Sequence, residues 1–381
     1  MGNTRGFLYG TSALATAATL GTVSVSAAAA ERIRVGLAGY HEQWVVYADQ
    51  DYKNNALTGA ERSTNAVDEK HNSEICFVGE TTLDNGITFG VNVQLEANTS
   101  SDEIDESYLY VESDSLGRLI LGDENNAGYL LHVTAPNGGI SIDSGDMVSD
   151  GFWVNPGLNY FDRATANTFL RFQDNDSGKA TYITPRFAGV QLGVSYIPNY
   201  EAGGDSNSSL KSSNNQINNG WAGGINYTED FNGFGLQLSA GYQYGDVAAD
   251  SLTGGNDDLH AYSFGAQFAY AGFSFGGAYA RGAGDMGGSL AGQRFNSRGW
   301  TVGTAYEVGP WKFGVGYMKG EENPTPNAGK GRLDQANVSG TYQLGPGIRL
   351  VGGVFWFDGE NEDNSQQNNG WGLTTGFKLG F

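Results

Sequence analysis

Acidic side chains gather in the longest stretch without regular alternation of apolar and polar residues, positions 123–166. They are Asp123, Glu124, Asp143, Asp146, Asp150 and Asp162. Carboxylates could exchange protons, bind a cation or hold a fixed negative field. The stretch also contains Met147, Phe152 and Trp153, so it is too apolar for a loop that simply extends into water. The role of these carboxylates therefore depends on the elements that position them.

Other patterns that could do chemistry are weaker. Gly282 to Gly287 fits GxGxxG, but no helix pattern follows, so we interpret it as a loop. Asp174 to Gly178 is similar to a calcium loop with its glycine out of register. This segment, Asp257-Asp258 and Glu360 to Asp363 could at most bind calcium weakly. The histidines lack metal-ligand spacing and Gly-x-Ser-x-Gly is absent, so we expect neither enzymatic activity nor a resident cofactor.

Strand-like alternation occupies most of the remaining chain. In Ile87 to Leu95 the odd positions are apolar and the even positions are polar or glycine, and Asn85-Gly86 before them is a strong hairpin signal. Tight turns alternate with polar loops at 200–218, 247–258, 285–294, 321–331 and 359–369. The pattern predicts an all-β, transmembrane antiparallel β-barrel of about 16 strands. At that size we interpret the small and polar inner face as a water-filled lumen.

The last twelve residues favour a membrane barrel over a soluble β-sandwich. One face of the expected strand carries Trp371, Leu373, Thr375, Phe377, Leu379 and Phe381. A soluble domain rarely leaves its terminus apolar, whereas an aromatic residue is favourable at a membrane interface. Aromatic residues near the ends of other expected strands support the same interpretation.

Composition limits the location and the partners. The net charge of −21 disfavours nucleic acid, and Cys76 has no second cysteine to pair with. Arg5, an apolar stretch and Ser26 to Ala30 predict an export signal over residues 1–30, followed by a mature barrel over 31–381. No apolar run in the mature chain reaches the roughly 20 residues of a spanning helix.

The acidic stretch interrupts the alternation of short turns and polar loops. Folding inward would pack its apolar residues on the barrel wall and hold its acids in the lumen. Carboxylates opposite basic wall residues would filter solutes by size and charge. A folded external cap is the alternative.

Four segments span the mature chain and carry a family resemblance. They are RIRVGLAGY (32–40), LGRLILG (116–122), YITPRFAGVQLGVSY (182–196) and GFKLGF (376–381). The chain resembles the general trimeric porins of Gram-negative bacteria, and is most similar to the alphaproteobacterial type with sixteen strands.

The resemblance implies passive diffusion of ions and small hydrophilic solutes through a homotrimer in the bacterial outer membrane. It implies that the third loop, about 123–166, folds inward. The pore constriction would then comprise Asp143, Asp146, Asp150 and Asp162 of the loop and Arg32, Arg34 and Arg118 of the wall. It also implies contact with outer-membrane lipid and lipopolysaccharide, and recognition of Phe377, Leu379 and Phe381 by the barrel insertion machinery.

The acids in and around the loop favour a weak preference for cations. A substrate-selective channel is the alternative within transport. A structural or adhesive barrel and an enzymatic outer-membrane barrel are alternatives from other classes.

Overall fold

The computed structural model describes residues 32–54, 60–97, 104–158, 164–172, 174, 177–200, 217–247, 257–285, 294–323 and 330–381. The expected export signal and Asp162 lie outside these ranges. Within them, no helix is both long and apolar enough to cross a membrane.

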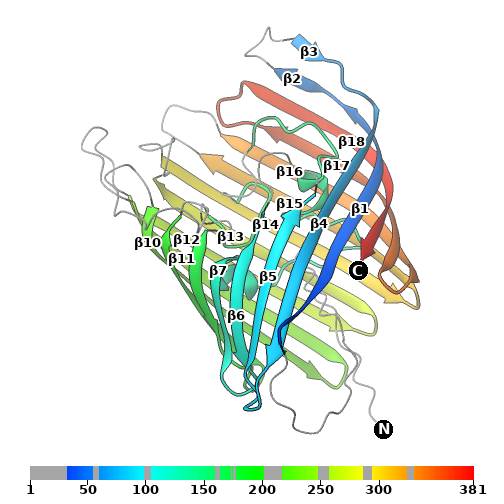
Figure 1. The fold of residues 1–381 in the computed structure, drawn as a ribbon. Coiled ribbons are helices and arrows are strands. Elements are labelled where there is room, and N and C mark those ends of the chain that lie inside the picture. Colours follow the sequence, from blue (N-terminus) through cyan, green and yellow to red (C-terminus); the bar gives the residue numbers. More distant parts are fainter. Residues whose placement is uncertain are drawn as a thin grey trace.

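Strands form nearly all the regular structure of the described residues (Figure 1). The first nine are β1 (Arg34–Gln50), β2 (Tyr52–Asn54), β3 (Ala60–Arg62), β4 (Val67–Thr82), β5 (Thr88–Glu96), β6 (Ser107–Ser113), β7 (Gly117–Asp123), β8 (Gly178–Ile183) and β9 (Val190–Asn199). The others are β10 (Ile217–Phe231), β11 (Phe234–Val247), β12 (Leu259–Tyr270), β13 (Phe273–Asp285), β14 (Arg294–Val308), β15 (Trp311–Asn323), β16 (Gly331–Gly345), β17 (Ile348–Glu360) and β18 (Gln366–Gly380).

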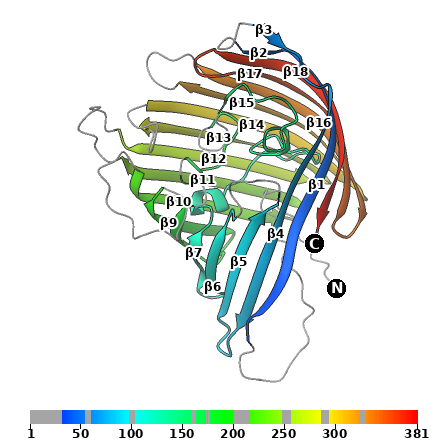
Figure 2. The same ribbon diagram turned by 45° about the horizontal axis from the view of Figure 1, so that its top comes forward.

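These strands form one antiparallel sheet that closes on itself. β1 pairs with β4 on one side and with β18 on the other, which joins the two ends of the sheet. β2 and β3 are three residues long and form a hairpin beside β18, so 16 of the 18 strands form the barrel wall. Figure 2 shows this ring of strands with part of the chain inside it. The expected antiparallel barrel is confirmed.

Tight turns join the strands in pairs at one end of the barrel, as expected. Asn232-Gly233 and Ala271-Gly272 connect β10 to β11 and β12 to β13 with positive φ at both residues. That geometry matches the twist of a two-residue hairpin.

The outer face carries aromatic side chains near both ends of the strands. The rings of Trp300 and Tyr317 lie 5.1 Å apart towards the loop end, and those of Trp311 and Tyr342 lie 4.5 Å apart at the tight-turn end. On β15 and β16 the exposed side chains between these two girdles, such as Val315 and Val338, are apolar. Such an outer surface is suited to hydrocarbon.

Two stretches differ from their sequence interpretation. Alternation weakens after Gly39, yet β1 continues to Gln50, because Trp44 and Val46 face inward and are buried. Gly282 to Asp285 completes β13 and is not a loop. A Cβ atom at Gly282 would lie 2.4 Å from the Phe172 ring, which explains the small residue there.

Candidate functional site: the inner loop and the wall it leaves open

The described residues of the segment between β7 and β8 (124–158, 164–172, 174 and 177) lie inside the barrel, and we call them the inner loop (Figure 2). It contains two short helices, α1 (Ala127–Leu130) and α2 (Asp146–Ser149). It extends beyond the expected end at 166, because Leu170 and Phe172 are buried against the wall instead of pairing in a strand.

Polar wall side chains hold the inner loop by its backbone. Hydrogen bonds join Ala127 N to Ser195 Oγ (2.8 Å), Val133 N to Ser239 Oγ (2.9 Å), Thr341 Oγ1 to Gly138 O (2.7 Å), Gln335 Nε2 to Ile142 O (2.7 Å) and Ala164 N to Ser297 Oγ (3.1 Å). They satisfy loop amides and carbonyls that would otherwise be buried without partners. The loop therefore lies along the inward face of β9–β18, which we call the covered wall.

Glycines allow the loop backbone to approach this wall closely. A Cβ atom at Gly265 would lie 1.7 Å from Val133 O, and one at Gly320 would lie 1.9 Å from Thr165 O. Real side chains cannot be that close, so the contact needs glycine. The sequence interpretation of the small inner residues as a water-filled lumen is therefore wrong for these positions.

An apolar core fastens the middle of the loop to β1 and β17. The Phe152 ring lies 5.2 Å from Trp44 in an edge contact, and the Trp153 ring stacks on Phe357 at 4.5 Å. All four side chains are buried. Burial of a large apolar side chain contributes about 1.5–3 kcal/mol, so this core holds the loop inside the barrel.

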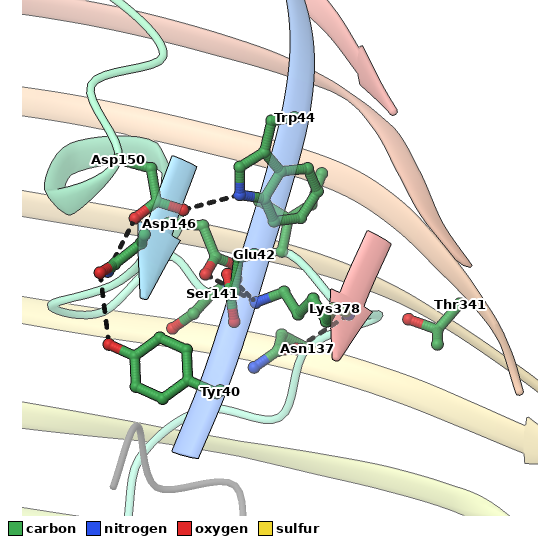
Figure 3. A network of polar contacts seen from close by, with 12 residues as sticks. Tyr40, Glu42, Trp44, Asn137, Ser141, Asp146, Asp150, Thr341 and Lys378 are labelled. Carbon is green, nitrogen blue, oxygen red and sulfur yellow. Dashed lines mark hydrogen bonds and ion pairs between the residues drawn. The ribbon is translucent and has the colours of Figure 1, made fainter. Parts of the chain in front are cut away.

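A charged seam lies beside that core (Figure 3). Lys378 Nζ of β18 is 2.7 Å from Asp146 Oδ1 of the loop and 3.0 Å from Glu42 Oε2 of β1. Asp150 accepts hydrogen bonds from Trp44 Nε1 (2.8 Å) and Asn72 Nδ2 (3.2 Å). The four charged residues are buried, with three carboxylates for one lysine. Burial, and then the nearby Asp146 carboxylate, raise the pKa of Asp150 to about 7.

Asp143 lies within the fold of the loop itself. Its carboxylate accepts a hydrogen bond from Thr168 N (2.8 Å) and from the hydroxyls of Thr134 and Thr168. It is 3% exposed, and burial raises its pKa. Of the loop acids expected at the constriction, Asp143 thus stabilises the loop, Asp146 and Asp150 join it to the wall, and Asp162 is outside the described residues.

The expected wall arginines lie at the tight-turn end of the barrel. Arg34 precedes Glu42 by eight residues on β1, about 26 Å along a strand. Arg118 is next to the turn between β6 and β7, over the Tyr110 ring at 4.3 Å. Arg32 lies just before β1. The structure therefore does not bring these arginines to the seam that holds Asp146 and Asp150.

Acids of β4 and β5, the strands that follow β1 in the wall, were not predicted as site residues. The carboxylates of Glu74, Glu96 and Asp105 lie within 4.8 Å of one another. The Tyr40 hydroxyl donates a hydrogen bond to Glu74 Oε1 at 2.8 Å. Ile75 and Leu95 are opposite each other in the pairing of β4 with β5 and face outward, and Ile75 is 39% exposed. Side chains alternate along a strand, so their neighbours Glu74 and Glu96 face inward. Alternation placed Glu96 on the inner face, but apolar residues on both faces of β4 obscured Glu74.

We call the inward face of β4–β6 the facing wall. Besides the acids it carries Lys70, Cys76 and Glu80. Among the described residues, two hydrogen bonds join the loop to its edges, from Asn72 to Asp150 (3.2 Å) and from Asn125 to Glu106 (2.9 Å) beside β6. The lumen therefore lies between the inner loop and an acidic wall.

A family model of Gram-negative porins matches residues 12–375, nearly the whole chain. The chain belongs to this family. It is an outer-membrane porin, a channel for passive diffusion of small solutes. No curated protein matches its sequence.

Solved porin structures share the fold of this porin at low sequence identity. The anion-selective porin from Comamonas acidovorans has a TM-score of 0.60 and 14% identity, covering 92% of this chain and 100% of the other. The outer-membrane channel DcaP of Acinetobacter baumannii has a TM-score of 0.60 and 14% identity, covering 93% and 99%. The trimer form of OmpT from Vibrio cholerae has a TM-score of 0.57 and 11% identity, covering 92% and 100%.

Proposed function

We propose that ions and small hydrophilic solutes cross this porin between the inner loop and the facing wall, with a preference for cations. The observation that carries the proposal is the group of Glu74, Glu96 and Asp105 carboxylates on the open side of the lumen. Fixed carboxylates along a pore attract cations and repel anions.

The fold alone does not set the sign of the preference. The Comamonas porin has a similar barrel and is anion-selective. The sign must therefore come from the residues that face the lumen. Among the described loop acids, Asp146 and Asp150 are occupied in the seam and Asp143 in the loop interior, so we assign the field to the facing wall.

The test is the purified porin in a planar bilayer with a potassium chloride gradient. We expect stepwise conductance and a reversal potential displaced towards the potassium equilibrium value. Folded protein without any conductance step would contradict the channel. Steps with a reversal potential on the chloride side would contradict only the cation preference.

We also propose a homotrimer, inserted through its last strand. The trimer form of the similar Vibrio cholerae structure supports the assembly. Phe377, Leu379 and Phe381 face outward along β18 and are 48%, 36% and 59% exposed, so they offer an apolar strip to the insertion machinery. We expect Phe381→Ala to lower the amount of folded porin in the outer membrane without lowering synthesis. Equal membrane levels would contradict this role.

Anionic lipid, including lipopolysaccharide, is a further proposed partner. Arg281 and Arg298 are paired across β13 and β14 on the outer face, one step beyond Tyr279 and Trp300 of the girdle. This position is level with lipid headgroups. Arg298 is paired with Glu321, whose Oε2 is 2.7 Å from Arg298 Nη2, so we propose Arg281 as the guanidinium that a lipid phosphate would bind.

We propose that residues 1–30 are removed on export and that the porin works without enzymatic activity or a resident cofactor. The Asp174 carboxylate, which belongs to the segment similar to a calcium loop, accepts hydrogen bonds from Asn126 Nδ2 and Gln243 Nε2, both at 2.8 Å. Those contacts give it a role in holding the loop to β11.

A further inference from the structure

A pocket of about 330 Å³ opens at the loop end of β16, β17 and β18, and we call it the rim pocket. On β17, Phe355 and Phe357 are buried inside the barrel, so the residues that alternate with them face outward. Asn368 of β18 is buried in the same way, which turns its two neighbours outward. The pocket is therefore on the outer face, and its lining side chains belong to Arg332, Trp356, Asp358, Glu360, Gln367 and Asn369.

The pocket extends from the aromatic girdle towards the loops. Trp356 is opposite Trp371 in the pairing of β17 with β18, and two residues nearer the loop Asp358 is opposite Asn369. Outward residues thus change from indole to polar side chains along both strands. Because aromatic girdles mark the membrane interface, the polar part of the pocket is level with lipid headgroups and open to water.

The indole of Trp356 has an uncovered face. Each of the other six tryptophans has an aromatic ring beside it within the described part of the chain. At the same end of the barrel, for example, the Trp300 ring lies 5.1 Å from Tyr317. Trp356 has no such neighbour among the described residues and is 43% exposed. It therefore offers a flat apolar surface to a ligand in the pocket.

Polar groups surround that surface in two forms. The Arg332 guanidinium holds two carboxylates in place, with Nη2 3.4 Å from Asp358 Oδ2 and Nε 2.9 Å from Glu360 Oε1. The side-chain amides of Gln367 and Asn369 make no hydrogen bond to any described residue. The pocket thus presents fixed acceptors together with amides that both donate and accept.

These groups exclude several classes of ligand. A phosphate would meet two carboxylates and one guanidinium that is already paired with them. A metal ion would have to displace the same guanidinium from the carboxylate oxygens. An acyl chain would cover charged groups without replacing their contacts with water, which is unfavourable. A neutral or amino-bearing polar ligand remains.

A sugar ring matches the pocket in shape and in chemistry. One face of a hexopyranose carries C–H groups that can pack on an indole, while its hydroxyls both donate and accept hydrogen bonds. Pockets for small ligands measure roughly 300–1,000 Å³, so this one is suited to a single ring.

We propose that the rim pocket binds a hexopyranose residue, which stacks on Trp356 and bonds to Asp358, Glu360 and the two amides. The residue can belong to the headgroup of a glycolipid in the adjoining leaflet or to a glycan in the medium. The pocket is outside the lumen, so this inference goes beyond the channel and its ion preference.

Saturation-transfer NMR tests the pocket on the purified porin in lauryldimethylamine oxide, because glycoside detergents would compete. The probes are methyl α-glucopyranoside, methyl α-galactopyranoside and glucosamine, and we expect transfer to the ring protons of at least one. Trp356→Ala should weaken that binding roughly tenfold. Trp300→Ala is the matched control, an outward tryptophan at the same end of the barrel, and should bind like the wild type. Equal transfer to wild type and Trp356→Ala would overturn the proposal.

A conservative variant separates stacking from a general disturbance of the rim. Trp356→Phe keeps a flat ring and should retain most of the affinity. If it binds as weakly as Trp356→Ala, stacking is not the basis of recognition and the proposal fails. Conductance steps of both variants should match those of the wild type because the pocket is outside the lumen, so failure of the pocket and failure of the channel are distinguishable.

A second measurement identifies the source of the sugar. Wild type and Trp356→Ala are reconstituted in vesicles of phosphatidylcholine with monogalactosyl diacylglycerol, extracted, and analysed for bound lipid by native mass spectrometry. Retention of the glycolipid by the wild type alone supports a lipid headgroup as the ligand. Transfer to a free probe without such retention supports a glycan from the medium. Equal retention by both proteins, with no transfer to any probe, would overturn the proposal.

Discussion

The covered wall and the facing wall belong to one barrel but meet different neighbours. On the covered wall, glycine and short polar side chains bond to the loop backbone, as Ser239 does with Val133 N at 2.9 Å. On the facing wall, Glu74 and Glu96 extend towards the lumen. Along the strands of both walls, inward residues alternate with apolar outward residues. Period-two polarity therefore identifies the face turned away from lipid. It does not tell whether water or protein covers that face.

The largest effect that separates the two walls should come from Lys378→Met. The change removes the only cation of the described seam and leaves the Glu42, Asp146 and Asp150 carboxylates buried together. We expect the loop to lose about 3–5 kcal/mol of docking free energy, measured by hydrogen exchange of its amides.

Lys319→Met is the matched control. Its ammonium lies 3.4 Å from Asp334 on the partly exposed outer face, where a pair contributes at most about 1 kcal/mol. Equal effects of the two lysine changes would contradict the seam.

A smaller effect is expected from Gly265→Val. The new Cβ would be placed 1.7 Å from Val133 O, so the loop must move away from β12. Overpacking of this kind costs about 1–3 kcal/mol. Gly36→Val is the control, because the nearest atom to its Cβ, Val78 O, is 3.9 Å away. Thermal unfolding of the two variants checks the comparison, which fails if Gly36→Val is the more damaging change.

The docking of the loop should also depend on pH through Asp150. Its pKa is raised to about 7, above the ordinary value near 4, so its contribution is fully present below about pH 4. It is lost as the pH rises through about 7, when a second charge forms beside Asp146. We expect protection of loop amides to weaken by on the order of 1 kcal/mol between about pH 5 and about pH 8. Asp150→Asn should remove that dependence; if the dependence persists, another group is responsible.

The smallest effect in free energy concerns ion selectivity. Glu74→Gln with Glu96→Gln removes two carboxylates from the facing wall, and salt screens what remains. We expect the preference for potassium over chloride to fall roughly threefold, on the order of 0.6 kcal/mol. Asp358→Asn with Glu360→Gln is a control of equal charge on the outer face. The reversal potential would count against the facing wall if it moved equally in both.

Much of the barrel could be predicted from alternation alone. Outward residues such as Phe275 and Val315 vary little in character because hydrocarbon surrounds them on β11–β15. The inner loop could be located by its length and apolar content, since both are unusual between two strands.

The contacts of the loop acids could not be predicted in the same way. Asp143, Asp146 and Asp150 were identified by charge, but charge does not reveal that Lys378, 232 residues away from Asp146, is their partner. The alternation along β1 was hard to recognise for a physical reason. Its inward Trp44 is apolar because it packs on the loop, and its outward Gln43 is polar, which reverses the usual order of polar inward and apolar outward residues. Such reversals depend on contacts between distant parts of the chain.

If solutes pass along the facing wall, a reagent in the lumen should reach the native Cys76. This thiol lies on the inward side of β4 and is half-buried, two residues from Glu74, whereas the inward Ala305 is 2% exposed on the covered wall. A cationic methanethiosulfonate reagent is added to single channels of the wild type and of Cys76→Ser with Ala305→Cys. We predict a lasting drop in conductance for the wild type and none for the variant. A drop through position 305 with none through Cys76 would contradict this account of the pore.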